Sequence, residues 1–386
     1  MKHTAFLPDS GGRNYGIDIL RIISMYMIVT EHVIGQGGLL VRNPNQLSAY
    51  YATWAVETAC FCAVNCYGLI SGYVGVYSRF RPGRILELWL QVFFYTSLIY
   101  LAAMLLHPEW LASASAEKAD SLVLKCFLPV SWNTYWYFSC YFVLSFFMPF
   151  INRMVKALSE RECSILFTVS FLLMCGLTLI PRNYDIDVLT LIGGYSFVWL
   201  AVLYVCGACL RRMDFRRLKS RWYILIYAVM IFISWIYKIL MENYTRKTLG
   251  TAKYGRMLTR YTAPTIFLAA VCLLLALEQV KIKSRAAITA IKWIAAGTFS
   301  VYIIHAHPII WNYVLKGAFK RFLKLPGVQI VPAILWTGLW IFVLCSLMDV
   351  VRRGFFKALR IRTFTDFIGN RISALSLKEG HSSREE

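Results

Sequence analysis

The first apolar run of the chain carries side chains that could perform acid-base chemistry. Asp18, Arg21, Glu31 and His32 lie in a segment that otherwise consists mainly of apolar residues. A charged side chain inside a membrane is costly unless it faces a partner or a polar cavity, so these residues are functional candidates. A neutral histidine can take a proton from a hydroxyl group, and this makes His32 a candidate general base.

Helix geometry places Arg21 and His32 on nearly the same face. They are eleven residues apart, which corresponds to about three helical turns and roughly 16 Å along the axis. Asp18, three residues before Arg21, is expected to lie beside it and to hold its guanidinium group. The alternative is that Asp18 and Arg21 form an ordinary pair at the membrane interface, and that His32 is satisfied by a backbone carbonyl.

Polar residues of the other apolar runs fall at two depths. Counting about 1.5 Å per residue from the expected cytoplasmic end of each helix puts Arg21 and Ser71 in an inner layer. An outer layer contains His32 together with Glu57, Trp136 and His305. The matching depths favour a shared site over isolated polar residues.

Arg79, Arg81 and Arg84 crowd one short segment below the inner layer. Guanidinium groups bind phosphate through paired hydrogen bonds, so these three could hold a phosphorylated cytoplasmic cofactor. Arginines also gather in cytoplasmic loops for topological reasons alone, and this second interpretation stays open.

The elements that must position these residues are membrane helices. The chain of 386 residues is 58% hydrophobic and 16% charged, whereas roughly a quarter of an average soluble chain is charged. Period-two alternation is absent, so the sequence predicts an all-α, polytopic membrane helical bundle rather than a barrel. About ten runs approach the length that spans a bilayer, namely 16–35, 50–77, 85–106, 135–152, 163–180, 189–210, 221–241, 261–280, 288–311 and 329–348.

The distribution of lysine and arginine predicts the orientation. With the amino terminus inside, the inner segments carry 25 of these residues and the outer segments 13, which favours both termini in the cytoplasm. The segment 242–260 runs against this bias, since it places five cations on the outer side. The net charge of +21 is expected to face anionic lipid, and no nucleic-acid-binding module is visible.

The domain organisation is expected to be simple. Residues 1–350 form one membrane domain and residues 351–386 a basic cytoplasmic tail, in which 352–362 is predicted to be an amphipathic surface helix. The amino terminus has no cleavable signal pattern. The eleven cysteines fall mostly inside the predicted helices, where they are expected to pack, and no metal site is predicted.

The ordered set of motifs resembles bacterial membrane acyltransferase family 3, the integral-membrane O-acyltransferases of surface polysaccharides. The similarity rests on the Arg-x10-His spacing of Arg21 and His32, on "GLISGYV" (68–74), on "YWYFSCYFVLSFFMPFIN" (135–152) and on "TFSVYIIHAHPII" (298–310). The resemblance implies a multi-pass protein of the bacterial cell membrane that transfers an acyl group, often acetyl, from cytoplasmic acyl-CoA. The implied acceptor is a hydroxyl of a cell-surface glycan or a lipid-linked sugar.

The resemblance also implies roles for individual residues. Arg21 and His32 would be the essential pair, Ser71, Gly72 and Tyr73 would belong to the acyl-CoA region, and His305 would be the late histidine of the family. Glu31 departs from the pattern, because an apolar residue more often precedes the histidine. It would either raise the basicity of His32 or have no role.

Chemistry favours direct transfer in which His32 is the base and Arg21 anchors CoA or organises Asp18. An acyl-enzyme on Ser71 would need an adjacent base that the sequence does not supply. The main alternative function is a glycan or lipid transporter or flippase; a receptor or scaffold is a third class. The five cations of 242–260, among them Arg246, Lys247 and Lys253, predict a negatively charged or diphosphate-linked acceptor if this segment is outside.

Overall fold

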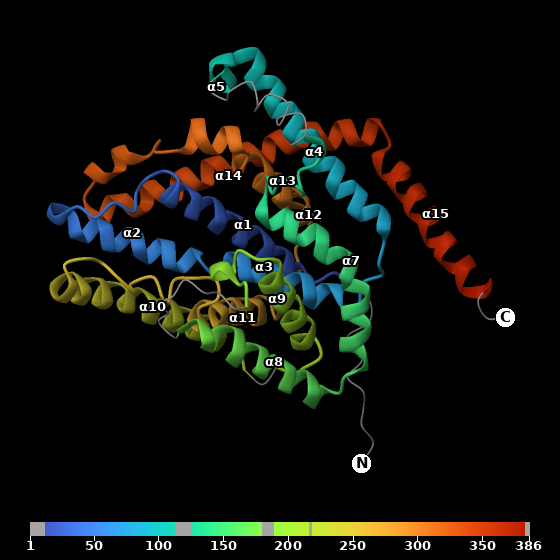
Figure 1. Ribbon diagram of the computed structural model, residues 1–386, viewed down its shortest axis with the longest axis horizontal. Helices are drawn as coiled ribbons and strands as arrows, with labels where there is room; N and C mark the ends of the chain where they lie inside the picture. The colour runs from blue at the N-terminus through green and yellow to red at the C-terminus, as the bar shows by residue number, and fades with distance from the viewer. Residues whose placement is uncertain (1–11, 113–125, 180–188, 216–217, 383–386) are drawn as a thin grey trace.

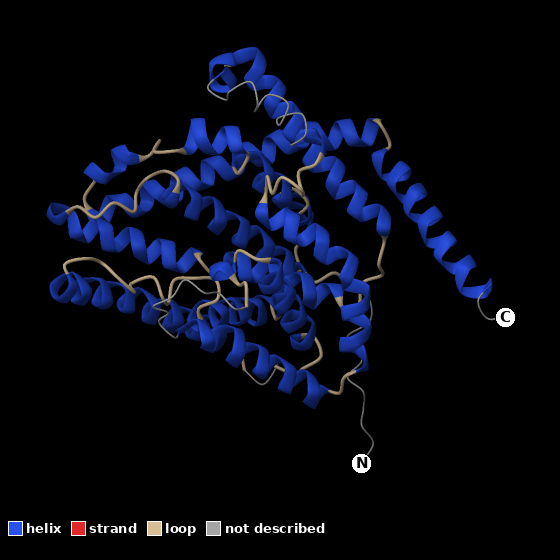
Figure 2. Cartoon of the chain, in the orientation of Figure 1, coloured by secondary structure: helices blue, strands red, loops and turns tan. Residues whose placement is uncertain are grey.

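The protein is an all-α helical membrane protein. The computed structural model describes residues 12–112, 126–179, 189–215 and 218–382, and these segments contain helices, turns and loops without a β-strand (Figures 1 and 2). The predicted fold class is therefore confirmed. Of the 25 lysines and arginines predicted to be cytoplasmic, Lys2, Arg216, Arg217 and Arg384 lie outside the described residues.

The bundle is built around α1 (Tyr15–Gly35), which contacts helices from both halves of the chain. The Asn14 side chain starts this helix by accepting hydrogen bonds from the amides of Gly16 and Ile17. The other main helices are α2 (Leu47–Cys60), α3 (Ala63–Gly75), α4 (Pro82–Leu106), α5 (Pro108–Ala112), α7 (Trp136–Ala157), α8 (Glu160–Gly176), α9 (Phe197–Leu210), α10 (Ser220–Leu249), α11 (Pro264–Glu278), α12 (Arg285–Ala295), α13 (Thr298–His305), α14 (Gly327–Ala358) and α15 (Ile361–Ser382).

All ten predicted runs coincide with helices. Seven helical segments in the described part of the chain are long and apolar enough to cross a membrane. The other three runs fall on α1, whose 21 residues include the charged candidates, and on the shorter α9 and α11. Two runs are each divided by a turn, 50–77 into α2 and α3 and 288–311 into α12 and α13. The number of spans and the sidedness of the termini stay predictions.

Close backbone contact fixes α3 against α9. A Cβ atom added to Gly72 would lie 1.8 Å from the carbonyl oxygen of Tyr204, and one added to Gly207 would lie 2.0 Å from that of Leu69. Gly68, one turn before Gly72 in α3, faces Leu203 of α9. Small residues at such spacing let two membrane helices approach closely, so Gly72 is required for packing.

The carboxy-terminal region differs from the predicted short surface helix over 352–362. The long helix α14 continues to Ala358, and the chain turns at Arg360, whose φ is +50°. α15 then packs beside α4, where a Cβ on Gly83 would lie 2.3 Å from the Thr365 carbonyl oxygen. The predicted tail boundary at 351 therefore falls inside a continuous helix. Figure 1 shows α15 in red along the side of the bundle.

Candidate active site

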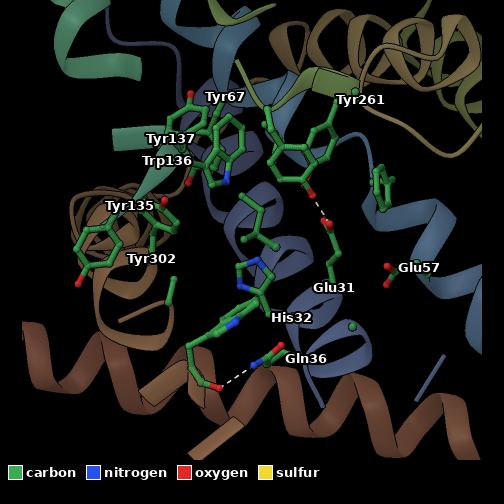
Figure 3. A pocket seen from close by; sticks show the side chains of 18 of the residues that line it. Glu31, His32, Gln36, Glu57, Tyr67, Tyr135, Trp136, Tyr137, Tyr261 and Tyr302 are labelled. Atoms are coloured by element: carbon green, nitrogen blue, oxygen red, sulfur yellow. Dashed lines mark hydrogen bonds between the residues drawn. The ribbon is translucent and has the colours of Figure 1, made fainter. Parts of the chain in front are cut away.

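Three of the four outer-layer residues, His32, Glu57 and Trp136, line one cavity of about 910 Å³. It lies among α1, α2, α7, α13 and the segment that precedes α11. His32, Glu31, Glu57 and Trp136 line it, as Figure 3 shows. His305, the fourth outer-layer residue, is not part of this lining, whereas Glu31 lines the cavity although the depth estimate did not include it.

His32 and His305 are in direct contact. His32 Nδ1 lies 2.8 Å from His305 Nε2, and His305 Nδ1 lies 2.5 Å from the carbonyl oxygen of Val301. A carbonyl can only accept, so His305 carries its proton on Nδ1 and its Nε2 is an acceptor. His32 must then donate from Nδ1. The lone pair of His32 is thereby placed on Nε2, as a proton acceptor requires.

The imidazole of His32 is held on a second side by Trp311. The indole meets the imidazole edge-on, with ring centroids 4.7 Å apart. Gln36, one turn after His32, donates a hydrogen bond of 3.0 Å to the Trp311 carbonyl oxygen. His32 Nε2 makes no hydrogen bond within the described residues, while the side chain is partly exposed to the cavity. The atom that would act as the base is therefore free to meet a substrate.

Glu31 does not contact His32, so the structure gives it no direct part in raising the basicity of that imidazole. Its Oε1 accepts a 3.0 Å hydrogen bond from the Tyr261 hydroxyl (Figure 3). Glu57, which belongs to α2, also lines the cavity and is 4% exposed.

Aromatic rings form one wall of the cavity. Trp136, at the start of α7, packs at 4.8 Å from Tyr195 and lies nearly parallel to Tyr261. Phe61 covers the other side of Tyr261 at 4.9 Å. The wall therefore offers flat apolar faces next to the two glutamates.

The inner layer contains the predicted pair of Asp18 and Arg21. Arg21 Nη1 lies 2.7 Å from Asp18 Oδ1, and Arg13 Nε lies 2.5 Å from Oδ2 of the same carboxylate. Asp18 is fully buried between these two guanidinium groups. Tyr67, which lines the cavity, donates to the backbone oxygen of Arg21 at 2.8 Å. The inner end of the cavity thus reaches the level of Arg21, although this side chain is turned toward Asp18.

Ser71, Gly72 and Tyr73 have different surroundings. The Ser71 hydroxyl donates to the Tyr67 carbonyl oxygen within α3, and no base lies against it among the contacts of the described chain. Gly72 faces α9, as described above. The Tyr73 hydroxyl accepts a 3.1 Å hydrogen bond from Arg211, whose guanidinium also lies over the tyrosine ring. Arg211 had been predicted only as one of many cytoplasmic cations.

Arg79, Arg81 and Arg84 lie at the turn between α3 and α4, and all three are exposed. α3 runs antiparallel to α1, so this turn lies at the end of the bundle where α1 begins. The three arginines remain candidates for phosphate binding.

The cations of 242–260 differ in their surroundings. Arg246 pairs with Glu242, a single carboxylate that is shared with Lys238 and Arg42. Arg256 and Arg260 line the cavity. The segment was predicted as a loop, but α10 continues to Leu249, and only its second half forms the cavity wall.

The comparison with protein families decides the identity. The family model described as "Acyltransferase domain" matches residues 14–349. The chain belongs to acyltransferase family 3. The resemblance stated from the motifs is thus confirmed, and this family member is an acyltransferase of the membrane. No curated protein and no solved structure matches the chain.

Several cavity residues were not found by reasoning on the sequence. Trp311 and Tyr261 lie at the ends of the predicted runs 288–311 and 261–280, where nothing marked them as site residues, whereas Arg256 had been counted among the five cations of 242–260. The aromatic residues of a membrane protein are too numerous to single out by type. In the described segments no cluster of three or more His, Cys, Asp or Glu side chains could hold a metal ion. All eleven cysteines are free, and all but Cys140 are buried.

Proposed function

We propose that this acyltransferase moves an acyl group, acetyl in the simplest case, from acyl-CoA to a hydroxyl of a cell-surface glycan or a lipid-linked sugar in the bacterial cell membrane. The observation that carries the proposal is the hydrogen-bonded series from the Val301 carbonyl through His305 to His32. It leaves an unprotonated Nε2 facing a cavity large enough for a sugar ring and a thioester.

The proposed reaction is a direct transfer. His32 Nε2 takes the proton of the acceptor hydroxyl as the oxygen attacks the thioester carbonyl. The carbon–sulfur bond then breaks, the acyl group remains on the sugar oxygen, and the CoA thiolate takes the proton from His32. His305 keeps Nδ1–H of His32 in a hydrogen bond throughout, so the positive charge formed during the transfer is delocalised on an oriented ring.

Acyl-CoA is proposed to approach from the end of the bundle where α1 begins. Arg79, Arg81 and Arg84 would bind its phosphates at the α3–α4 turn, and guanidinium groups suit that task. Arg21 and the Tyr73–Arg211 pair lie farther along α1 and α3, at the level where the arm of CoA would enter. The acyl carbon would meet the acceptor beside His32.

Labelled acetyl-CoA tests the proposal. Membranes that contain the protein should move label into glycan or lipid-linked sugar, and membranes with His32→Ala should not. A transporter or flippase, the alternative function, would give no covalent label in either case. Label that moves equally with His32→Ala would contradict the role of His32.

A further inference from the structure

Two buried carboxylates face the cavity with oxygen atoms that lack hydrogen-bond donors. Glu31 is 7% exposed and Glu57 is 4% exposed, and both line the cavity. Oε2 of each has no hydrogen-bond partner among the residues that the structure describes. Buried carboxylate oxygens without donors are unfavourable, and in folded proteins they are nearly always satisfied by a ligand, water or protein group.

The two glutamates share the cavity with a cation, because Arg256 also lines it. The Arg256 guanidinium lies 5.2 Å from the ring centroid of Trp54, which also lines the cavity. Figure 3 shows the Glu31 carboxylate pointing toward the Tyr261 hydroxyl, with Glu57 as the second acidic side chain of the same pocket. The site therefore offers hydrogen-bond acceptors, a guanidinium donor and aromatic faces together.

This combination matches the chemistry of a sugar ring. Each hydroxyl can donate to a carboxylate oxygen and accept from a guanidinium group. The apolar face of the ring can pack on Trp136 and Tyr261, which lie 6.3 Å apart in a nearly parallel arrangement. Glu31 and His32 both line the cavity, so a ring bound by Glu31 can present a neighbouring hydroxyl to the base within the same space.

We propose that Glu31 and Glu57 bind hydroxyl groups of the acceptor, and that the acceptor presents a neutral ring with a second hydroxyl beside the one that is acylated. This inference rests on the proposed function and adds the group by which the acceptor is recognised. An ammonium-bearing ring is disfavoured, because two cations, Arg256 and Arg260, line the same cavity.

Binding without acyl-CoA tests the inference separately from catalysis. The purified full-length protein is titrated with the methyl glycosides of glucose, galactose, mannose and N-acetylglucosamine, and tryptophan fluorescence reports occupancy because Trp54, Trp136 and Trp311 line the cavity. At least one glycoside should bind in the millimolar range. Its monodeoxy analogues are then compared with it, and removal of the hydroxyl that meets Glu57 should weaken binding by about tenfold or more.

Variants of Glu57 show whether this side chain binds that hydroxyl. With Glu57→Ala the parent glycoside and the critical deoxy analogue should bind within about twofold of each other, since the discriminating acceptor is gone. Glu57→Gln keeps the shape of the side chain and should retain part of the discrimination. Glu160→Gln removes a carboxylate at the start of α8, away from the cavity lining, and should keep the wild-type pattern.

Several results would overturn the inference. Absence of binding for all four glycosides would leave water as the partner of the glutamates. If the Glu57→Ala variant still bound the parent glycoside more tightly than the deoxy analogue, another residue would bind that hydroxyl. Tighter binding of methyl glucosaminide than of methyl glucoside would indicate a cation site. Glycoside binding that depends on Glu57, without any acyl transfer, would refute the proposed function alone.

Discussion

The contact between His32 and His305 gives the sharpest prediction about catalysis. His305→Phe retains a ring of similar size, so the buried site stays filled, but the ring cannot accept the hydrogen bond from His32 Nδ1 that is 2.8 Å long in the structure. One hydrogen bond of this kind contributes about 1 kcal/mol net, and about 1.4 kcal/mol corresponds to tenfold in rate. His305→Phe should therefore lower kcat by up to about tenfold. His32→Ala, which removes the base, should lower kcat by roughly 10²- to 10⁴-fold.

The two effects should not add, because His305 acts only through His32. The double variant His32→Ala/His305→Phe should have the same residual kcat as His32→Ala alone. His305→Gln offers an amide oxygen to His32 and should recover part of the loss.

The assay follows release of the CoA thiol by the purified protein with acetyl-CoA and an acylatable glycoside. Ser346→Ala serves as a control, since Ser346 is buried in α14 and bonds only to its own helix. If adding His305→Phe to His32→Ala lowered kcat by the same factor as it does in the wild type, His305 would act independently of His32. The proposed role of His305 in orienting His32 would then be refuted.

Three further predictions concern the donor, the acceptor and the fold. Charge reversal at Arg81 and Arg84 should raise KM for acyl-CoA by about tenfold or more while kcat changes less, because it removes phosphate binding rather than chemistry. An unchanged KM would show that these two arginines do not bind acyl-CoA and serve only membrane topology. Neutralising Arg256 and Arg260 should weaken use of a diphosphate-linked acceptor, whose charge lies outside the neutral ring, more than neutralising Arg246, Lys247 and Lys253, since only the first pair lines the cavity. Equal effects would refute the assignment. A Thr251→Cys variant labelled by an impermeant thiol reagent reports whether this segment is outside. Gly72→Ala should lower stability by about 1–3 kcal/mol, seen as a lower Tm, because its Cβ would lie 1.8 Å from the Tyr204 carbonyl oxygen; an unchanged Tm would show that α3 and α9 separate without cost.

The membrane helices could be predicted from the sequence because lipid imposes a length and a composition on every span. The same reasoning placed His32 and His305 at one depth, since rise per residue is constant within a helix. The direct contact of their rings could not be predicted, because it depends on the rotation of α1 and α13 about their axes. That rotation is set by packing against other helices.

Loop-borne residues of the site were the least predictable part. Arg256 and Tyr261 belong to a segment without periodicity, and their approach to Glu57 and Glu31 depends on how the chain returns from α10 to α11. The role of Gly72 was also hidden, because the motif Ser-Gly-Tyr suggested cofactor binding, while the structure places this glycine against α9. Short motifs do not distinguish a packing glycine from a binding glycine.

Mass spectrometry of surface glycans tests the central claim most directly. Cells that contain the wild-type chain should carry glycans heavier by one acyl group than those of cells that lack it, and cells with His32→Ala should match the cells that lack the chain. The size of the mass difference identifies the acyl group, and the modified species identifies the acceptor. Identical glycans with and without the chain, or the full mass difference in cells with His32→Ala, would contradict acyl transfer that depends on His32.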